Sequence, residues 1–300
     1  MKKFNNNATE KLYNVVMSNT KKVGKKEYAD IPVELLFADE LFQRVGSSSK
    51  RKIKELADKW NPDKMDALKV VPHPEEKRFS VVDGYHRLSA AIIIGQPSLE
   101  CEIIMGLSTV PSKRLIQEAT LFATQNEEVD TLSPVECHKA NVLRGVSENI
   151  IVEELINKYH INLKTNPSHG KVQMGQLAGF TMALSVARVS GKATLNDVFD
   201  ILCQSRWNLS TSGLGSNAIH VVYNLLRLHP EHKEAVRQSL VHIFEGIEPN
   251  GLFYKAYAKY PARKERERIL LYAEDLVCEE LGIARVYYGG SVSDVLKRIA

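Results

Sequence analysis

The segment from Ser80 to Ala91, "SVVDGYHRLSAA", places an Asp-Gly turn and a His-Arg pair where an apolar run changes to helical spacing. A helix N-terminus presents unpaired backbone N–H groups and a partial positive charge, so an anion bound there is stabilised. Gly84 would allow the backbone to approach that anion closely, and His86 and Arg87 add side chains that can carry positive charge. The segment is a candidate phosphate-binding turn, and the alternative is a plain turn followed by an exposed His-Arg pair.

Short strands and a helix must position this turn. "ALKVV" at 67–71 and "RFSVV" at 78–82 are separated by the turn-rich "PHPEEK", which predicts a β-hairpin with a long loop. From Tyr85 onward the apolar residues share a helical face, and Gly95 is the expected C-terminal stop. "ECEIIMG" predicts the next strand.

The chain after the first 130 residues has a helical texture. Ser133 and Glu136 have the spacing of a capping box, which predicts a helix beginning at "LSPVECHKA". Apolar residues then recur at helical spacing to the end of the chain. The exceptions are "INLK" at 161–164 and "GKVQM" at 170–174, which predict a small hairpin.

We therefore expect an α+β first half followed by an all-α second half. The expected divisions are residues 1–27 as a loosely attached arm or peripheral helix, 28–130 as the α+β domain and 131–300 as the helical domain.

Composition limits the functional classes. The formal net charge of +4 permits a polyanionic partner, and lysines and arginines crowd the first quarter of the chain, in the basic arm at 21–26 and in the basic segment 44–54. The N-terminal sequence lacks the apolar region of a secretory signal, and no apolar run is long enough for a membrane span, so a cytoplasmic protein is expected. Four scattered cysteines without Cys-x-x-Cys spacing argue against a zinc ribbon or a disulfide framework.

The segment "VVDGYHRLSAA" resembles the second conserved box of the ParB family, which has the form Gly-Glu-Arg-Arg-x-x-Ala. Gly84, Arg87 and Ala90 match this box, whereas Tyr85 and His86 depart from it. The segment is more similar to the Asp-Gly-Gln-His-Arg variant of ParB-like proteins from phages and mobile elements.

Two further segments resemble the other ParB boxes in the same order. "LFQRVG" resembles the first box, with Gln43 and Arg44 in the places of its Gln and Arg. "QNEEVDTLSPVECHKA" resembles the third box, in which Glu128 and Val129 replace a Gln-Arg pair. The positions that match the third box are Asn126, Leu132, Pro134 and Glu136.

The resemblance implies a ParB/sulfiredoxin-like fold with a pocket for a nucleoside triphosphate, CTP or ATP, and Mg²⁺. It implies that Gly84 and Arg87 contact phosphates, that Arg44 is a second cation over the site, and that Asn126 helps to place the metal or the phosphates. The full expected site is Gln43, Arg44, Asp83, Gly84, His86, Arg87 and Asn126. Because histidine and valine replace two arginines, weaker triphosphate binding or a different ligand is expected.

Sulfiredoxin shares the fold and has Gly-Cys-His-Arg at the equivalent turn, where its His and Arg bind ATP phosphates. Gly84, His86 and Arg87 match this version also, but Tyr85 stands in the place of the reactive cysteine. Thiolate chemistry is therefore excluded at this turn.

DNA is the second expected partner. ParB proteins continue into a helix-turn-helix domain, but 147–189 lacks a compact pair of helices with a basic recognition helix. Phosphate contacts with little sequence readout are therefore expected from the basic segment 44–54 and from the basic arm. The candidate DNA-binding residues are Lys50, Arg51, Lys52 and Lys54.

The leading hypothesis is a ParB-like nucleotide-binding protein that acts with DNA in the partition, regulation or maintenance of a mobile element, with a homodimer as one expected state. One alternative is a phosphotransferase or metal-dependent nuclease, which requires a carboxylate other than Asp83 near the phosphates. The candidate carboxylates for this chemistry are Asp63, Asp66, Glu75 and Glu76. A further alternative is a non-catalytic interaction protein. His229 and His232 have metal-ligand spacing, but two exposed imidazoles at a helix start are favoured.

Overall fold

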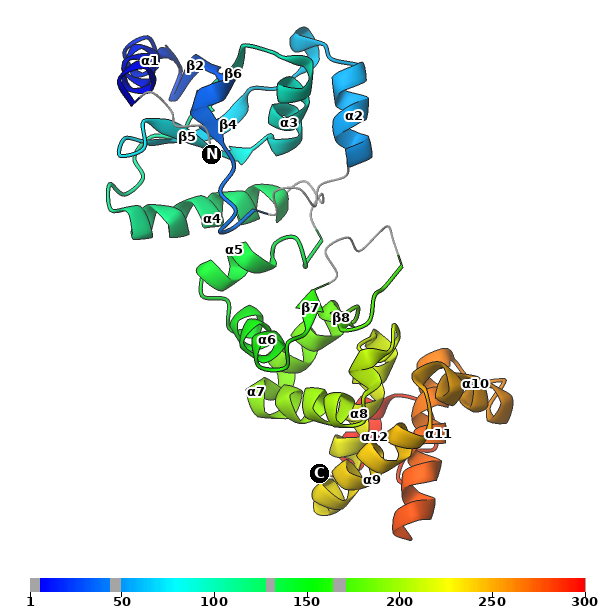
Figure 1. The fold of residues 1–300 in the computed structure, drawn as a ribbon. Helices are drawn as coiled ribbons and strands as arrows, with labels where there is room; N and C mark the ends of the chain where they lie inside the picture. The colour runs from blue at the N-terminus through cyan, green and yellow to red at the C-terminus, as the bar shows by residue number, and fades with distance from the viewer. Residues whose placement is uncertain (1–5, 44–49, 128–132, 164–170, 300) are drawn as a thin grey trace. The chain divides into compact units, whose positions relative to one another are not determined.

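The computed structural model describes residues 6–43, 50–127, 133–163 and 171–299, which fall into two compact units (Figure 1). Unit 1 is Met1–Gly145 and unit 2 is Val146–Ala300. Unit 1 is a mixed α/β structure and unit 2 is largely helical, so the expected fold class is confirmed.

Unit 1 is built on a six-stranded mixed sheet with the order β1-β2-β6-β4-β5-β3. The strands are β1 (Lys21–Val23), β2 (Lys26–Pro32), β3 (Leu36–Phe37), β4 (Leu68–His73), β5 (Arg78–Asp83) and β6 (Ser98–Ile103). The expected hairpin is confirmed, because β4 and β5 pair antiparallel with His73 opposite Arg78 and Lys69 opposite Asp83. The two ends of this hairpin are therefore well separated.

Helices cover both faces of this sheet (Figure 1). Phe79 and Val81 of β5 point into one core, together with Tyr13 and Leu88, whereas Val82 points into the other core. This alternation follows from the two-residue period of a strand. The helices of unit 1 are α1 (Asn6–Ser18), α2 (Lys50–Asp58), α3 (Tyr85–Ile94), α4 (Pro111–Glu127) and α5 (His138–Leu143), with 3₁₀ turns η1 (Val33–Leu35) and η2 (Pro62–Lys64).

Two segments are more closely integrated into unit 1 than the sequence suggested. Tyr13 and Val16 bury one face of α1 in the core, so residues 6–18 are a packed helix and not a loose arm. Ala140 of α5 packs with Ala119 and Ala123 of α4, which extends unit 1 to Gly145 instead of residue 130. Only half of the expected capping box forms: Oε2 of Glu136 accepts from the N–H and the hydroxyl of Ser133, but the Glu136 N–H donates to the Ser133 carbonyl, and the helix begins later, at His138.

Unit 2 is a helical assembly in which α8 is buried on most of its surface. Its helices are α6 (Ser147–Lys158), α7 (Phe180–Gln204), α8 (Ser216–Leu228), α9 (Lys233–Gly246), α10 (Pro249–Lys259), α11 (Glu265–Leu281) and α12 (Val292–Ile299), with η3 (Trp207–Leu209) and η4 (Pro230–His232). Among the described helices, none combines the length and apolar character that a membrane span requires.

The prediction of a small hairpin at 161–174 is wrong. β7 (Asn162–Leu163) pairs with β8 (Gln176–Leu177), and the two strands run parallel. Parallel strands cannot be joined by the tight turn of a hairpin, so the pairing differs from the expected one in kind.

Candidate functional site

The N-terminus of α3 directly follows β5. Gly84 is its N-cap residue, with φ +98° and ψ 20°, and makes no side-chain capping hydrogen bond. The first helical bond runs from the Leu88 N–H to the Gly84 carbonyl at 3.0 Å. Among the described residues, the backbone N–H groups of Tyr85, His86 and Arg87 have no hydrogen-bond acceptor. These three donors and the helix dipole together can bind an anion.

Gly84 is required at this position for two structural reasons. Its positive φ is unfavourable for a residue with a side chain. A Cβ atom would also lie 2.8 Å from Cγ of Leu68 and 3.0 Å from Nη2 of Arg87. The turn can therefore form only with glycine, whether or not a ligand is bound.

Arg87 lies beside the turn but is already engaged by protein groups. Its Nη1 donates to the carbonyl of Asp66 and, at 3.4 Å, to that of Ala67, and its Nη2 donates to Oδ2 of Asp83 at 3.2 Å. The guanidinium thus fixes the chain before β4 against the start of α3. It contributes positive charge to the turn, but only its remaining N–H bonds are free for phosphate.

Charged side chains from two other elements act on His86. Burial lowers the pKa of His86, the Lys52 ammonium lowers it further, and the Glu136 carboxylate opposes them. The imidazole is therefore neutral near pH 7. Lys52 belongs to α2 and Glu136 to the turn before α5, so both lie within electrostatic reach of the α3 N-terminus. Sequence reasoning assigned Lys52 to DNA, because nothing local shows that α2 packs on α3.

The other expected nucleotide contacts are only partly described. Gln43 is buried, and its Nε2 donates to the carbonyl of Val81 in β5, so its amide holds the strand that leads to the turn. Arg44 lies outside the described residues. Asn126 lies in the last turn of α4, and its side chain is outside the described part of the structure.

The basic segment expected to bind DNA is largely the helix α2. Lys50, Arg51, Lys52 and Lys54 are all exposed. Arg51 forms an ion pair with Glu55 at 2.8 Å, which partly neutralises this face of the helix.

Glu75 and Glu76 lie in the loop of the β4–β5 hairpin, at the opposite end from Gly84. They are therefore excluded as carboxylates acting at the α3 N-terminus. Asp66 reaches that region through its backbone carbonyl, and the side chain of Asp63 is outside the described part of the structure. Glu136 was not among the carboxylates expected from the sequence, but its negative charge acts on His86 and opposes the lowering of the His86 pKa.

Two groups of side chains have donor atoms close enough to share a metal ion, all within 4.8 Å of one another. In the first group the Arg114 guanidinium already contacts Glu75 and lies 3.4 Å from Nδ1 of His73. In the second group both carboxylate oxygens of Glu274 accept backbone hydrogen bonds. Each group is thus satisfied by protein donors, and neither is assigned a metal. The groups are His73, Glu75 and Glu76, and His229, Glu274 and Cys278.

The interpretation of His229 as an exposed imidazole is wrong. His229 is buried, and its Nε2 lies 3.0 Å from Oε1 of Glu274, whereas His232 is exposed. The two histidines therefore do not form a metal site, because the chain turns between them and directs only one into the core.

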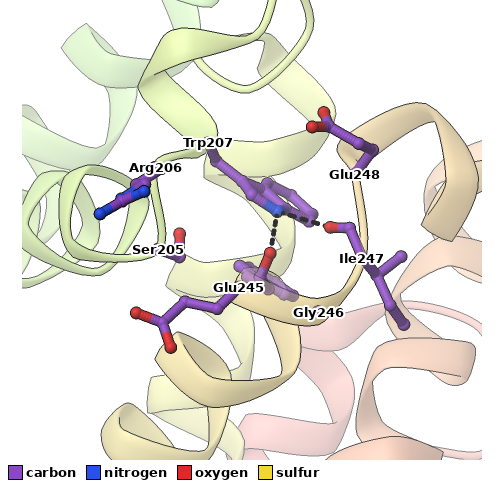
Figure 2. Close-up of a pocket in the computed structure, with 8 residues that line it drawn as sticks. Ser205, Arg206, Trp207, Glu245, Gly246, Ile247 and Glu248 are labelled. Carbon is purple, nitrogen blue, oxygen red and sulfur yellow. Dashed lines mark hydrogen bonds between the residues drawn. The ribbon is translucent and has the colours of Figure 1, made fainter.

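A pocket of about 320 Å³ lies in unit 2 beside Trp207 (Figure 2). The indole stacks on Phe244 with ring centroids 3.8 Å apart, and its N–H donates to the carbonyls of Phe244 and Ile247 at 2.9 Å. The tryptophan's donor is fully used within the protein. The pocket therefore offers mainly the side chains at its rim, Arg206, Glu245 and Glu248, and we assign it no ligand.

Comparison with known proteins adds little to this geometry. No protein family model and no curated protein matches the chain. Among solved structures, the chain is similar to the C-terminally truncated chromosome-partitioning protein ParB from Caulobacter crescentus complexed with CTP-gamma-S. The identity is 12%, the alignment covers 71% of this chain and 98% of that chain, and the TM-score is 0.27. A score this low carries no argument about fold or function, so the case for a phosphate site rests on the turn itself.

Proposed function

We propose that unit 1 binds the phosphates of a nucleoside triphosphate at the N-terminus of α3. The observation that carries this proposal is the set of three backbone N–H donors that find no acceptor in the described part of the chain, at a turn that carries positive charge from Arg87 and Lys52. The resemblance of "VVDGYHRLSAA" to the second ParB box supports a triphosphate, CTP or ATP, as the ligand.

Mg²⁺ would accompany the triphosphate. Mg²⁺ at such sites is held by one or two carboxylates together with phosphate oxygens and water. Both hydrogen bonds from Ser133 end on Oε2 of Glu136, and Oε1 has no partner among the described residues. Glu136 is therefore the carboxylate that we assign to the metal, which supplies charge neutralisation for the phosphates.

DNA is the proposed partner of the nucleotide-bound protein, in the partition, regulation or maintenance of a mobile element. The exposed Lys50, Arg51 and Lys54 on α2 would contact DNA phosphates without reading the sequence. Lys52 instead belongs to the proposed nucleotide site, because its charge acts on His86.

Isothermal titration of the full chain with CTP, ATP and GTP in Mg²⁺ tests the nucleotide site. The informative variant is His86→Glu, because a carboxylate in the first helical turn favours the helix dipole but repels phosphate. We expect at least about tenfold weaker binding, which corresponds to about 1.4 kcal/mol. Circular dichroism would verify that the variant is folded.

The matched control is Ile93→Glu, which adds the same charge to an exposed position in the last turn of the same helix. This variant should bind nucleotide as tightly as the wild type. The proposal fails if the wild type binds none of the three nucleotides, or if folded His86→Glu binds as well as Ile93→Glu.

Glu136 also favours a second function, hydrolysis of the bound nucleotide. In this alternative, Oε1 of Glu136 would orient water as a general base instead of binding Mg²⁺. Phosphate release should then stop in Glu136→Gln while the protein still folds. Absence of phosphate release from the wild type under saturating nucleotide would exclude this function and leave binding alone.

A further inference from the structure

The segment from α10 to the first turn of α11 is unusually rich in basic and aromatic side chains. Between Leu252 and Arg268 it contains six lysines and arginines, three tyrosines and two glutamates. Tyr254 and Tyr257 follow one another at helical spacing on α10 and are 74% and 51% exposed. Large aromatic side chains are costly to expose, so two on one surface indicate an interaction. We call this region the α10–α11 surface.

Tyr257 is held in place by a neighbour on α11. The Arg268 guanidinium carbon lies 4.7 Å from the centroid of the Tyr257 ring, and Nη1 of Arg268 donates to the carbonyl of Arg263 at 3.5 Å. The arginine covers one face of the ring and leaves the ring half exposed. An aromatic ring that is already fixed loses less conformational entropy when a ligand stacks on it.

The positive charge of this surface is only partly neutralised. Lys259 pairs with Asp275 at 2.8 Å, and Arg263 pairs with Glu267 at 3.1 Å. By contrast, four cations of this surface have no carboxylate partner anywhere in the described ranges, and one of them, Arg268, covers Tyr257; the four are Lys255, Lys264, Arg266 and Arg268. The second glutamate, Glu265, accepts a hydrogen bond from Asn217 at 3.2 Å. The surface therefore favours a polyanion.

We propose that the α10–α11 surface binds single-stranded nucleic acid. Bases stack on Tyr254 and Tyr257, and the cations without partners contact the backbone phosphates. Single strands satisfy both features because their bases are free to stack, whereas a duplex keeps its bases paired and offers mainly phosphates. This inference goes beyond the proposed nucleotide site, since it uses no residue of unit 1.

Fluorescence anisotropy of the full chain with a labelled oligothymidylate of about 20 nucleotides tests the proposal. We expect Tyr254→Ala/Tyr257→Ala to weaken binding about 30-fold or more, since each stacked base contributes strongly. Tyr254→Phe/Tyr257→Phe should remain within about threefold of the wild type, because phenylalanine retains the stacking face. Circular dichroism would verify that each variant is folded.

The charge contribution has its own test. Lys255→Gln/Lys264→Gln should reduce the slope of log affinity against log salt by about 1.4, or about 0.7 per lost phosphate contact. The matched control is Lys11→Gln/Lys113→Gln, which removes the same charge from exposed positions of α1 and α4. The control should leave both the affinity and the slope unchanged.

Several outcomes would overturn the proposal. These are no binding of the oligothymidylate, equal affinity of the alanine and wild-type proteins, tighter binding of a duplex of equal length that weakens in Lys255→Gln/Lys264→Gln, or equally effective competition by polyglutamate. Failure of the nucleotide site is separable, since folded His86→Glu should keep its full affinity for the oligothymidylate. Loss of that affinity in His86→Glu would place the single-strand site in unit 1 and contradict the assignment to α10 and α11.

Discussion

Each unit buries a histidine against a glutamate, but the two pairs differ in what surrounds them. In unit 1, Nε2 of His73 lies 2.7 Å from Oε1 of Glu118, and in unit 2, Nε2 of His229 lies 3.0 Å from Oε1 of Glu274. Both glutamates are fully buried, with 0% exposure. A buried carboxylate requires compensating donors, so the source of those donors reveals what each pair holds together.

Glu118 is compensated by another charge. Arg114, only 4% exposed, lies on the same helix with Nε 3.5 Å from Oε1 of Glu118, and it also contacts Glu75. Oε2 of Glu118 has no hydrogen-bond partner among the described residues. This network joins α4 to the loop of the β4–β5 hairpin through side chains alone.

Glu274 is compensated mainly by the backbone, with Nε of Arg285 at 3.9 Å from its Oε2. Its Oε1 accepts from the N–H groups of Val286 and Tyr287 at 2.9 and 3.0 Å, and its Oε2 accepts from Tyr287 at 3.1 Å. These hydrogen bonds therefore anchor the segment after α11 to the core of unit 2. A buried His–Glu pair therefore joins α4 to the hairpin loop in unit 1, whereas in unit 2 such a pair anchors the irregular segment after α11.

The largest expected effect is in unit 2. Glu274→Ala should reduce the free energy of unfolding by about 3 to 5 kcal/mol, because it leaves His229 and two backbone donors unsatisfied. Hydrogen exchange measured by mass spectrometry on the full chain should show lost protection at Val286 and Tyr287.

The matched control uses an exposed pair on the same helix. Nδ1 of His242 lies 3.2 Å from Oε1 of Glu280, with the two side chains 78% and 33% exposed. Glu280→Ala should change stability by less than about 0.5 kcal/mol. If both substitutions have equal effects, burial does not distinguish these pairs and the comparison fails.

A smaller effect is expected in unit 1. Glu118→Ala should reduce the free energy of unfolding by about 2 to 3 kcal/mol, since Arg114 keeps Glu75 as a partner. Hydrogen exchange of the amides in β4 and β5 would measure the change. Glu118→Gln should lower the free energy of unfolding less than Glu274→Gln does. At position 118 the amide NH₂ takes the place of Oε2, which has no partner among the described residues. At position 274 the NH₂ would point at the Tyr287 N–H, which now donates to Oε2. The reverse order would contradict the difference drawn between the two networks.

The smallest effect concerns a histidine that faces an arginine instead of a glutamate. Burial, assisted by Arg266, lowers the pKa of His220 from 6.5 to about 4. The unfolded chain therefore binds the proton more readily, so this contribution is complete above pH 6.5 and is lost as the pH falls towards 4. We expect a loss on the order of 1 to 2 kcal/mol between about pH 7 and about pH 4.5.

His220→Gln should flatten this pH dependence. Trp60 and Trp207 are the two tryptophans of the chain, so Trp60→Phe leaves Trp207 as a reporter of unit 2. Urea unfolding followed by Trp207 fluorescence at the two pH values would measure the difference. An unchanged pH dependence in His220→Gln would show that other groups cause the acid sensitivity.

Local features were predictable because near neighbours in the chain encode them. The β4–β5 hairpin and the α3 helix with its Gly95 stop formed where the residues indicated, whereas the helix expected from Ser133 begins only at His138. The parallel pairing of β7 and β8 was not predictable, because strand direction depends on the path of the chain between them.

The candidate site was only partly predictable. "SVVDGYHRLSAA" correctly marked a glycine turn that opens a helix, since Gly84 has the positive φ that its position requires. The sequence could not indicate that Arg87 is held by backbone carbonyls, or that Lys52 and Glu136 act on His86. These relations join α2, α3 and the turn before α5, which are far apart in the chain.

The sequence by itself determined the α+β and helical halves, the uncapped turn at Gly84 and the basic composition of α2 and of 252–268. Tertiary structure alone decided which charges are available at those places. It buried His229 against Glu274, engaged Arg87 with carbonyls, and left Tyr254 exposed. The physical reason is that helix and turn formation depend on interactions over a few residues, whereas burial and charge pairing depend on which distant segments pack together.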